Sequence, residues 1–200
     1  MKRIFVSFLI FFAGSMFVQT KGISNSLNPE SFISEVIDEA KVILSSSSSS
    51  DEKANKLSEI ALKTVDIKGL AFYTLGKKRK EITPEELKRY ESLFEKYFLK
   101  SFTSRLTDYS DPKINVLSSD VINEKYTIVK TMLLKTDKRP EVKIDWRVYT
   151  KDPSNPLIRD LIIEGLSLAR TQKEEFASVL NTNNNDINAL FSTLERFIEK

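Results

Sequence analysis

Three carboxylates and one tyrosine in the second half of the chain have the types and spacing that acid–base chemistry needs. Asp160 and Glu164 belong to one apolar, strand-like run and are expected on the same face of it, because their positions differ by an even number, four. With Asp145 and Tyr126 they could surround a polar pocket in which one carboxyl group donates a proton and another accepts it. This hypothesis describes a small enzyme with an α+β-cone fold.

A structural role is the simpler interpretation of the same residues, and it is the one that we favour. Arg147 or Arg159 can pair with these carboxylates across neighbouring strands. Gly165 then provides a bulge or a bend where the run turns into a helix. The chain also has no histidine and no cysteine, which excludes Ser-His-Asp triads, Cys-His nucleophiles and the usual zinc sites. Catalysis is left to carboxylates, Lys, Tyr, Ser and Thr, which permits an enzyme but does not favour one. We therefore predict no catalytic residue, no metal site and a protein that is not an enzyme.

The N-terminal residues have the pattern of an export signal. Two basic residues precede an apolar run, Ile4–Phe12, and small or polar residues follow it. Because this run is short for a membrane-spanning helix, we predict a signal peptide over residues 1–22, cleaved somewhere in 20–26. The remaining residues, 27–200, suit a single domain. Without the three basic residues of the leader the formal charge of +3 falls to zero, so nucleic acid is a poor partner.

Helix signals follow the leader. The sequence Asn-Pro-Glu from Asn28 predicts a helix start. That helix is expected to end in a run of serines, residues 45–50, which we interpret as a flexible surface loop. Two more helices are predicted around Leu57–Val65 and Ile67–Leu75, the second ending at Gly76.

The longest predicted helix opens with a capping box, Thr83 with Glu86, and runs to about Tyr109. One side of it is unusually rich in aromatic residues. A plain hydrophobic core would explain this stripe, but large aromatic faces also line cavities for flexible hydrocarbon. The stripe consists of Leu87, Tyr90, Phe94, Tyr97, Phe98, Phe102, Leu106 and Tyr109.

A hydrophobic period of two then predicts strands, and their short connections imply an antiparallel meander. A capping box at Thr171–Glu174 opens a further helix, and Asn183–Asp186 separates it from a last amphipathic helix. The fold class is therefore α+β, with a four-stranded antiparallel sheet packed against N-terminal and C-terminal helices and an apolar pocket between them. The four strands are expected at 113–118, 124–135, 142–149 and 157–168.

Several segments together resemble the MlaC family. They are PEVKIDWRVY, IRDLIIEGLSLARTQKEEFASVL and FYTLGKKRKEITPEELKRYESLFEKYFLKSFTSRLTDYS, and the similarity covers about Phe32–Phe197. Proteins of this family, also called toluene-tolerance proteins, bind phospholipid in the periplasm for the ABC transport system that maintains outer-membrane lipid asymmetry. This chain departs from the family pattern at Lys78 and Arg79, where aromatic residues are common, and at Asn184–Asp186, where glycines are usual.

The resemblance implies a monomeric, soluble periplasmic carrier of phospholipid that uses no cofactor. Its implied partners are an inner-membrane complex of an MCE-domain protein with an ABC transporter, and an outer-membrane lipoprotein–porin complex. A hopanoid or another polycyclic lipid is an alternative cargo, and a structural envelope adaptor with a filled core is an alternative function.

We expect the lipid to contact the inward sides of the long helix and the strands. The predicted lipid-binding residues are Phe72, Phe94, Tyr97, Phe98, Phe102, Leu106, Ile128, Met132, Leu134, Ile144, Trp146, Val148, Ile162, Leu166, Phe176 and Val179. A basic cluster, Lys77, Lys78, Arg79 and Lys80, is either a solvated loop or a contact for an acidic partner or a lipid headgroup.

Overall fold

The computed structural model describes residues 28–107, 111–137 and 139–200. Tyr109 and the predicted signal peptide lie outside these ranges, and no helix inside them is long and apolar enough to cross a bilayer. The helices are α1 (Pro29–Leu44), α2 (Ser50–Thr64), α3 (Ile67–Leu75), the short 3-10 helix η1 (Gly76–Lys80), α4 (Pro84–Leu106), α5 (Leu168–Thr182) and α6 (Ile187–Glu199). The strands are β1 (Ile114–Asn123), β2 (Tyr126–Leu133), β3 (Val142–Tyr149), β4 (Leu157–Ile163) and β5 (Leu166–Ser167).

Side-chain caps set where the first helices begin. The Asn28 side chain accepts a hydrogen bond from the backbone N–H of Glu30 at 3.0 Å, which confirms the predicted start of α1. The predicted capping box of Thr83 with Glu86 opens α4. A capping box at Ser49 also opens α2, so the end of the serine run starts a helix and the predicted loop is shorter than 45–50.

The predicted start of α5 is wrong. The helix begins at Leu168, because the Ser167 hydroxyl accepts a hydrogen bond from the backbone N–H of Arg170 at 3.1 Å. The Thr171 hydroxyl lies one turn inside the helix and donates to the Ser167 carbonyl. Serine and threonine are both good N-caps, and the sequence offers both within four residues.

The sheet has five antiparallel strands in the order β1-β2-β3-β4-β5, one more than predicted. The predicted fourth strand, 157–168, is two strands joined by the turn Glu164–Gly165, whose φ angles are 49° and 82°. A two-residue hairpin needs positive φ at both turn positions, which glycine adopts freely and glutamate seldom does. The first predicted strand is also longer, reaching Asn123.

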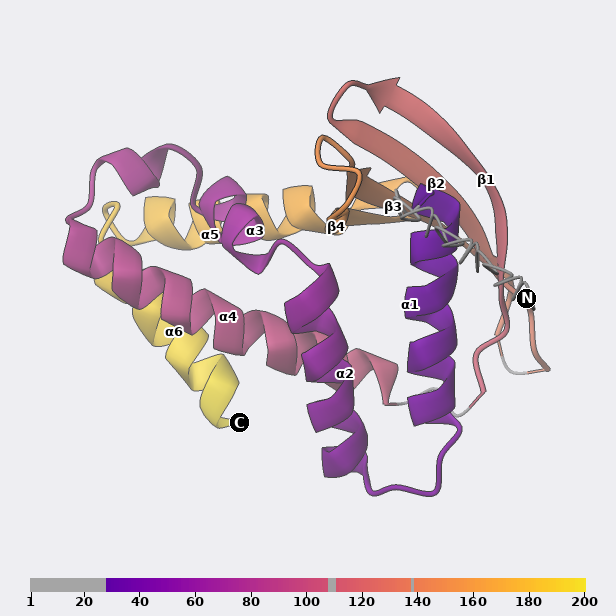
Figure 1. Ribbon diagram of the computed structural model, residues 1–200. Helices are drawn as coiled ribbons and strands as arrows, with labels where there is room; N and C mark the ends of the chain where they lie inside the picture. The colour runs from indigo at the N-terminus through magenta and orange to yellow at the C-terminus, as the bar shows by residue number, and fades with distance from the viewer. Residues whose placement is uncertain (1–27, 108–110, 138) are drawn as a thin grey trace, which may run out of the picture.

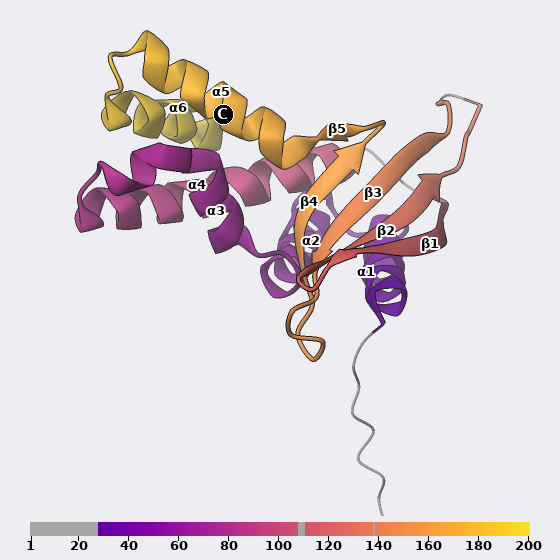
Figure 2. The same cartoon turned by 90° about the horizontal axis from the view of Figure 1, so that it is seen from above.

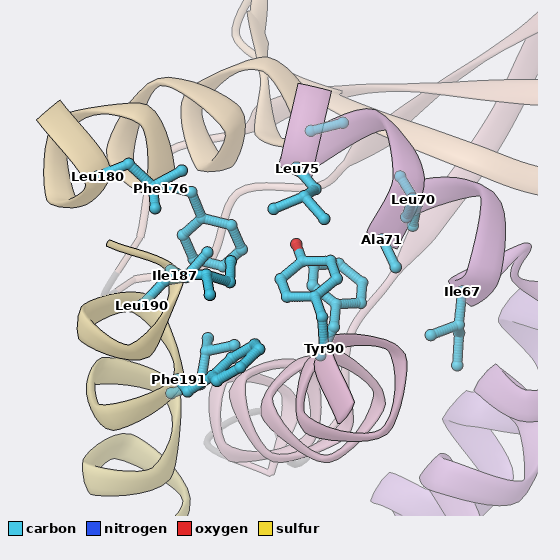
Figure 3. Close-up of a cluster of buried hydrophobic side chains, with 13 residues drawn as sticks. Ile67, Leu70, Ala71, Leu75, Tyr90, Phe176, Leu180, Ile187, Leu190 and Phe191 are labelled. Atoms are coloured by element: carbon cyan, nitrogen blue, oxygen red, sulfur yellow. The ribbon is translucent and has the colours of Figure 1, made fainter. Parts of the chain in front are cut away.

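Two hydrophobic clusters hold the fold together. In the helical body, α3, α4, α5 and α6 pack around Tyr90, Phe176 and Phe191 (Figure 3). In the sheet body, α1 lies on one face of the sheet and buries Phe32, Ile33 and Ile37 against it (Figure 1). Seen from above, β5 leads directly into α5, and the helical body extends to one side of the sheet (Figure 2). The α+β class is confirmed.

Candidate functional site

One face of the sheet is almost entirely apolar. Residues directly opposite each other in neighbouring strands share a face, so the register assigns Val129, Trp146 and Leu161 to one row across it. We define the apolar sheet face, on which α1 packs, as Ile114, Val116, Thr127, Val129, Thr131, Leu133, Val142, Ile144, Trp146, Val148, Ile158, Leu161, Ile163 and Leu166. Of the predicted site residues, Ile144, Trp146, Val148 and Leu166 lie on it.

This face is covered at one end only. Val129 and Val148 are fully buried under α1. Further along the same face, Ile144 and Ile163 are only half-buried, and Leu166 is 70% exposed. We call the incompletely covered part the open end of the apolar sheet face; it consists of Leu133, Val142, Ile144, Ile163 and Leu166. Large apolar side chains that remain partly exposed side by side form a surface suited to an apolar ligand.

A hydrogen-bonded pair fixes the indole ring in this face. Trp146 Nε1 donates to Thr131 Oγ1 at 2.9 Å, and Thr131 Oγ1 donates to the Ile144 carbonyl at 2.9 Å. Thr131 is fully buried, so its hydroxyl needs these partners. The only tryptophan in the chain is thereby held next to the open end.

Replacing Thr131 by valine is expected to lower the free energy of unfolding by about 2 kcal/mol, because the indole N–H loses its acceptor while the side-chain shape is conserved. Urea unfolding followed by far-ultraviolet circular dichroism measures this change. Thr103→Val is the matched control, because the buried Thr103 hydroxyl donates to backbone carbonyls of its own helix, those of Leu99 and Lys100. Equal and small effects of the two substitutions would contradict the role given to Thr131.

The aromatic stripe of α4 changes its environment along the helix. Tyr90 and Phe94 are buried in the helical body, where burial raises the pKa of Tyr90 far above its ordinary range. Phe98, Phe102 and Leu106 are half-buried, and the Phe98 and Phe102 rings stack with centroids 5.8 Å apart. The helix packs on α2, α3 and α6, and its rings also contact Phe176 of α5.

A separate groove of about 380 Å³ is lined by three more of the predicted lipid-binding residues, Tyr97, Phe176 and Val179. It lies between α4, α5 and α6, and Leu194 and Phe197 of α6 complete its apolar wall. Tyr97 donates a hydrogen bond from its hydroxyl to Gln172 Oε1 at 2.7 Å at the edge of this groove, and burial raises the pKa of Tyr97. Phe72, on α3, is half-buried, and the ammonium group of Lys68 lies 5.4 Å from its ring centroid.

Three predicted lipid contacts lie on the opposite face of the sheet from Trp146, so they cannot line one pocket with it. Ile128 is paired with Arg147, Met132 with Lys143, and Ile162 with Asp145. Leu134 follows the end of β2.

The error has a physical source in β2. The strand contains two adjacent apolar residues, Ile128 and Val129, so a period of two fits in either phase. The buried threonines at positions 127 and 131 made the true inward phase look polar. Lys130, which belongs to the phase of Ile128, was the signal against that choice. The residues of the apolar sheet face that the prediction left out are Ile114, Val116, Val129, Thr131, Leu133, Val142, Leu161 and Ile163.

Two of the three carboxylates that suggested acid–base chemistry, Asp160 and Glu164, have separate structural partners. Asp160 is 5% exposed and accepts hydrogen bonds from the Ser167 hydroxyl at 2.6 Å and the Ala169 N–H at 3.0 Å, with Arg147 4.0 Å away. Glu164 is exposed in the hairpin turn, where its carboxylate accepts the backbone N–H of Lys143. The pairing of Arg147 with Asp160 confirms one predicted cross-strand pair.

The fold and the sequence both match known proteins. The chain is similar to a solved structure of the phospholipid-binding protein from Ralstonia solanacearum in complex with a phospholipid. The TM-score is 0.72 at 16% identity, and the match covers 85% of this chain and 96% of that one. The family model of the MlaC protein matches residues 34–196. Because this match spans most of the sequence, the chain belongs to the MlaC family.

Proposed function

We propose that this protein is a periplasmic carrier that holds the acyl chains of a phospholipid against the open end of the apolar sheet face. The observation that carries the proposal is the group of large apolar side chains left incompletely covered there, from half-buried Ile144 to exposed Leu166. The buried Thr131 hydroxyl beside this surface already has hydrogen-bond partners within the protein, so it does not require a polar group from a ligand. Membership of the MlaC family and the phospholipid bound to the Ralstonia protein support the same proposal.

The physical need for such a carrier is large. A two-tailed lipid exposes about thirty methylene groups, and transferring them to water costs about 25 kcal/mol at roughly 0.8 kcal/mol each. A protein that replaces the bilayer with apolar side chains removes most of this barrier without recognising the headgroup. We place the tails between the open end and the half-buried part of the α4 stripe, Phe98, Phe102 and Leu106, because both surfaces are apolar and incompletely covered.

The proposed transport route follows from the family. Residues 1–22 act as a cleaved signal peptide, and the monomeric mature protein moves lipid between an outer-membrane lipoprotein–porin complex and an inner-membrane complex of an MCE-domain protein with an ABC transporter. Phospholipid is the proposed cargo rather than a hopanoid, because the similar Ralstonia protein is in complex with a phospholipid.

Trp146 allows a direct test, because it is the one tryptophan in the sequence and all tryptophan fluorescence therefore comes from its side chain. The mature protein is purified without detergent, and native mass spectrometry identifies any bound lipid. Phospholipids with bromine atoms on their acyl chains are then added, and tryptophan fluorescence is recorded. We expect a stoichiometric phospholipid adduct and strong quenching by the brominated lipid.

Each step of this test can contradict a different part of the proposal. A protein that binds no lipid, even after incubation with vesicles, would disprove the carrier function. A protein that binds lipid with unchanged fluorescence would retain the function and disprove the binding face, and the groove next to Tyr97 would then be the better location.

A further inference from the structure

A cationic patch with an exposed aromatic ring lies far from the apolar sheet face. Residues 67–80 carry five basic side chains and no acidic one. Lys77, Arg79 and Lys80 are exposed on η1, which joins α3 to α4. Figures 1 and 2 both place this connection at the end of the helical body away from the sheet.

Contacts within the patch bring α5 next to this connection. The Lys173 ammonium group lies 5.0 Å from the ring centroid of Tyr73, and Tyr73 is 42% exposed. Gly76, at φ +61°, leaves room for Lys173, since a Cβ there would lie 3.3 Å from Lys173 Cε. We define the cationic patch as Tyr73, Lys77, Arg79, Lys80 and Lys173.

The charges of this patch are not neutralised within the fold. Lys78 pairs with Glu81 at 3.4 Å, but among the described residues no carboxylate lies within salt-bridge distance of the four cations of the patch. Arg79 donates a hydrogen bond to the Phe72 carbonyl at 3.1 Å, so part of its guanidinium group is committed to the backbone. The patch therefore presents a diffuse positive field rather than a forked site shaped for one carboxylate.

We propose that the cationic patch docks the protein on an anionic membrane surface through phospholipid headgroups. Flexible lysines beside an exposed tyrosine suit a bilayer interface, where ammonium groups meet phosphates and the aromatic ring lies at headgroup depth. An acidic protein partner would bind best to cations that are held in a defined geometry for pairing with carboxylates, and these side chains are not held in one. Docking at this end leaves the apolar sheet face free, so it is independent of cargo binding.

The test compares two charge-matched double variants. Lys77→Glu with Lys80→Glu changes the patch, and Lys56→Glu with Lys125→Glu makes the same charge change elsewhere. All four lysines are exposed, and none of their side chains forms a salt bridge within the described residues. Each protein is sedimented with vesicles of phosphatidylglycerol and phosphatidylcholine, or of phosphatidylcholine alone, at low and high salt. Bound cargo lipid is measured in parallel by native mass spectrometry.

The natural protein should sediment with the anionic vesicles only, and only at low salt, because salt screens such attraction. The patch variant should lose at least about 25-fold in partitioning, at roughly fivefold for each cation removed, while the control loses much less. Equal losses in both variants, or no preference of the natural protein for anionic vesicles, would overturn the proposal. Binding to soluble polyglutamate without vesicle binding would instead identify an acidic protein partner. Cargo content should stay unchanged in the patch variant, so failure of the carrier function would be visible separately.

Discussion

Replacing Ile163 by aspartate is expected to abolish phospholipid binding, while the same replacement at Ile162 is expected to leave it nearly intact. The two isoleucines are adjacent in β4 and both half-buried, but the register assigns them to opposite faces. Ile163 lies opposite Ile144 at the open end of the apolar sheet face. Ile162 lies opposite Asp145 on the polar face.

The size of the effect follows from desolvation. An aspartate at position 163 would meet acyl chains in the bound state and water in the free state, so the charge opposes binding but not folding. The effective cost of removing one ion from water is several kcal/mol, and about 4 kcal/mol corresponds to roughly a 1000-fold higher Kd. At position 162 the new carboxylate would lie opposite Asp145, a like-charge pair that lowers the free energy of unfolding somewhat. It would still have water and the ammonium group of Lys143, which contacts Asp145 at 3.4 Å, beside it, and it would not meet the acyl chains.

The measurement is lipid content after detergent-free purification, followed by titration with a phospholipid whose fluorescent tail reports on its surroundings. Thermal unfolding of both variants without lipid serves as the folding control, and both should melt within a few degrees of the natural protein. If both variants lost lipid equally, or if Ile163→Asp retained it, the apolar sheet face would not be the binding surface.

Fold class and several element boundaries could be predicted from local signals. The caps of α1 and α4, the glycine that ends α3 at Gly76, and the break between α5 and α6 at Asn183–Asp186 each depend on a few neighbouring residues, and each is confirmed. The β4–β5 hairpin was missed because Glu164 is an unusual residue for positive φ. The backbone strain at Glu164 is offset by the hydrogen bond that its carboxylate accepts from the Lys143 N–H of the neighbouring strand.

The site was harder to predict because it depends on register, which is a relation between strands. Choosing the wrong phase for β2 moved Ile128 and Met132 to the wrong face at once, as a period of two requires. β3 was assigned correctly because Val142, Ile144, Trp146 and Val148 alternate with charged or polar residues without exception. Burial of threonines with internal hydrogen bonds cannot be recognised from one strand alone.

The largest stability effect is expected at the junction between the helical body and the sheet body. Asp66 is the N-cap of α3: its Oδ1 accepts the Gly69 N–H at 2.9 Å. Its Oδ2 accepts hydrogen bonds from Arg159 of β4, with 2.6 Å to Nε and 2.6 Å to Nη2. Asp66→Ala should lower the free energy of unfolding by about 3 kcal/mol, of which about 1 kcal/mol is the cap and about 2 kcal/mol the charge-assisted bonds.

Gly69 provides a second test of the position of the Asp66 carboxylate. Because glycine has no side chain, it leaves room for this carboxylate over the start of α3. A Cβ at position 69 would lie 2.3 Å from Asp66 Oδ2 and 2.6 Å from Asp66 Cγ, so the carboxylate would have to leave both of its partners. Gly69→Ala alone should therefore destabilise the protein by about 2 kcal/mol, even though alanine favours a helix over glycine by about 1 kcal/mol.

In the Asp66→Ala background the sign should reverse, because nothing then occupies the space and only the helix preference of alanine remains, a gain of about 1 kcal/mol. The double-mutant cycle thus has an expected coupling of about 3 kcal/mol, measured by urea unfolding of all four proteins. Asp66→Asn separates the two parts, since an amide keeps the cap and loses the charge. A Gly69→Ala variant that is stabilised in both backgrounds would show that the carboxylate does not sit over α3, and that Arg159 joins the two bodies in some other way.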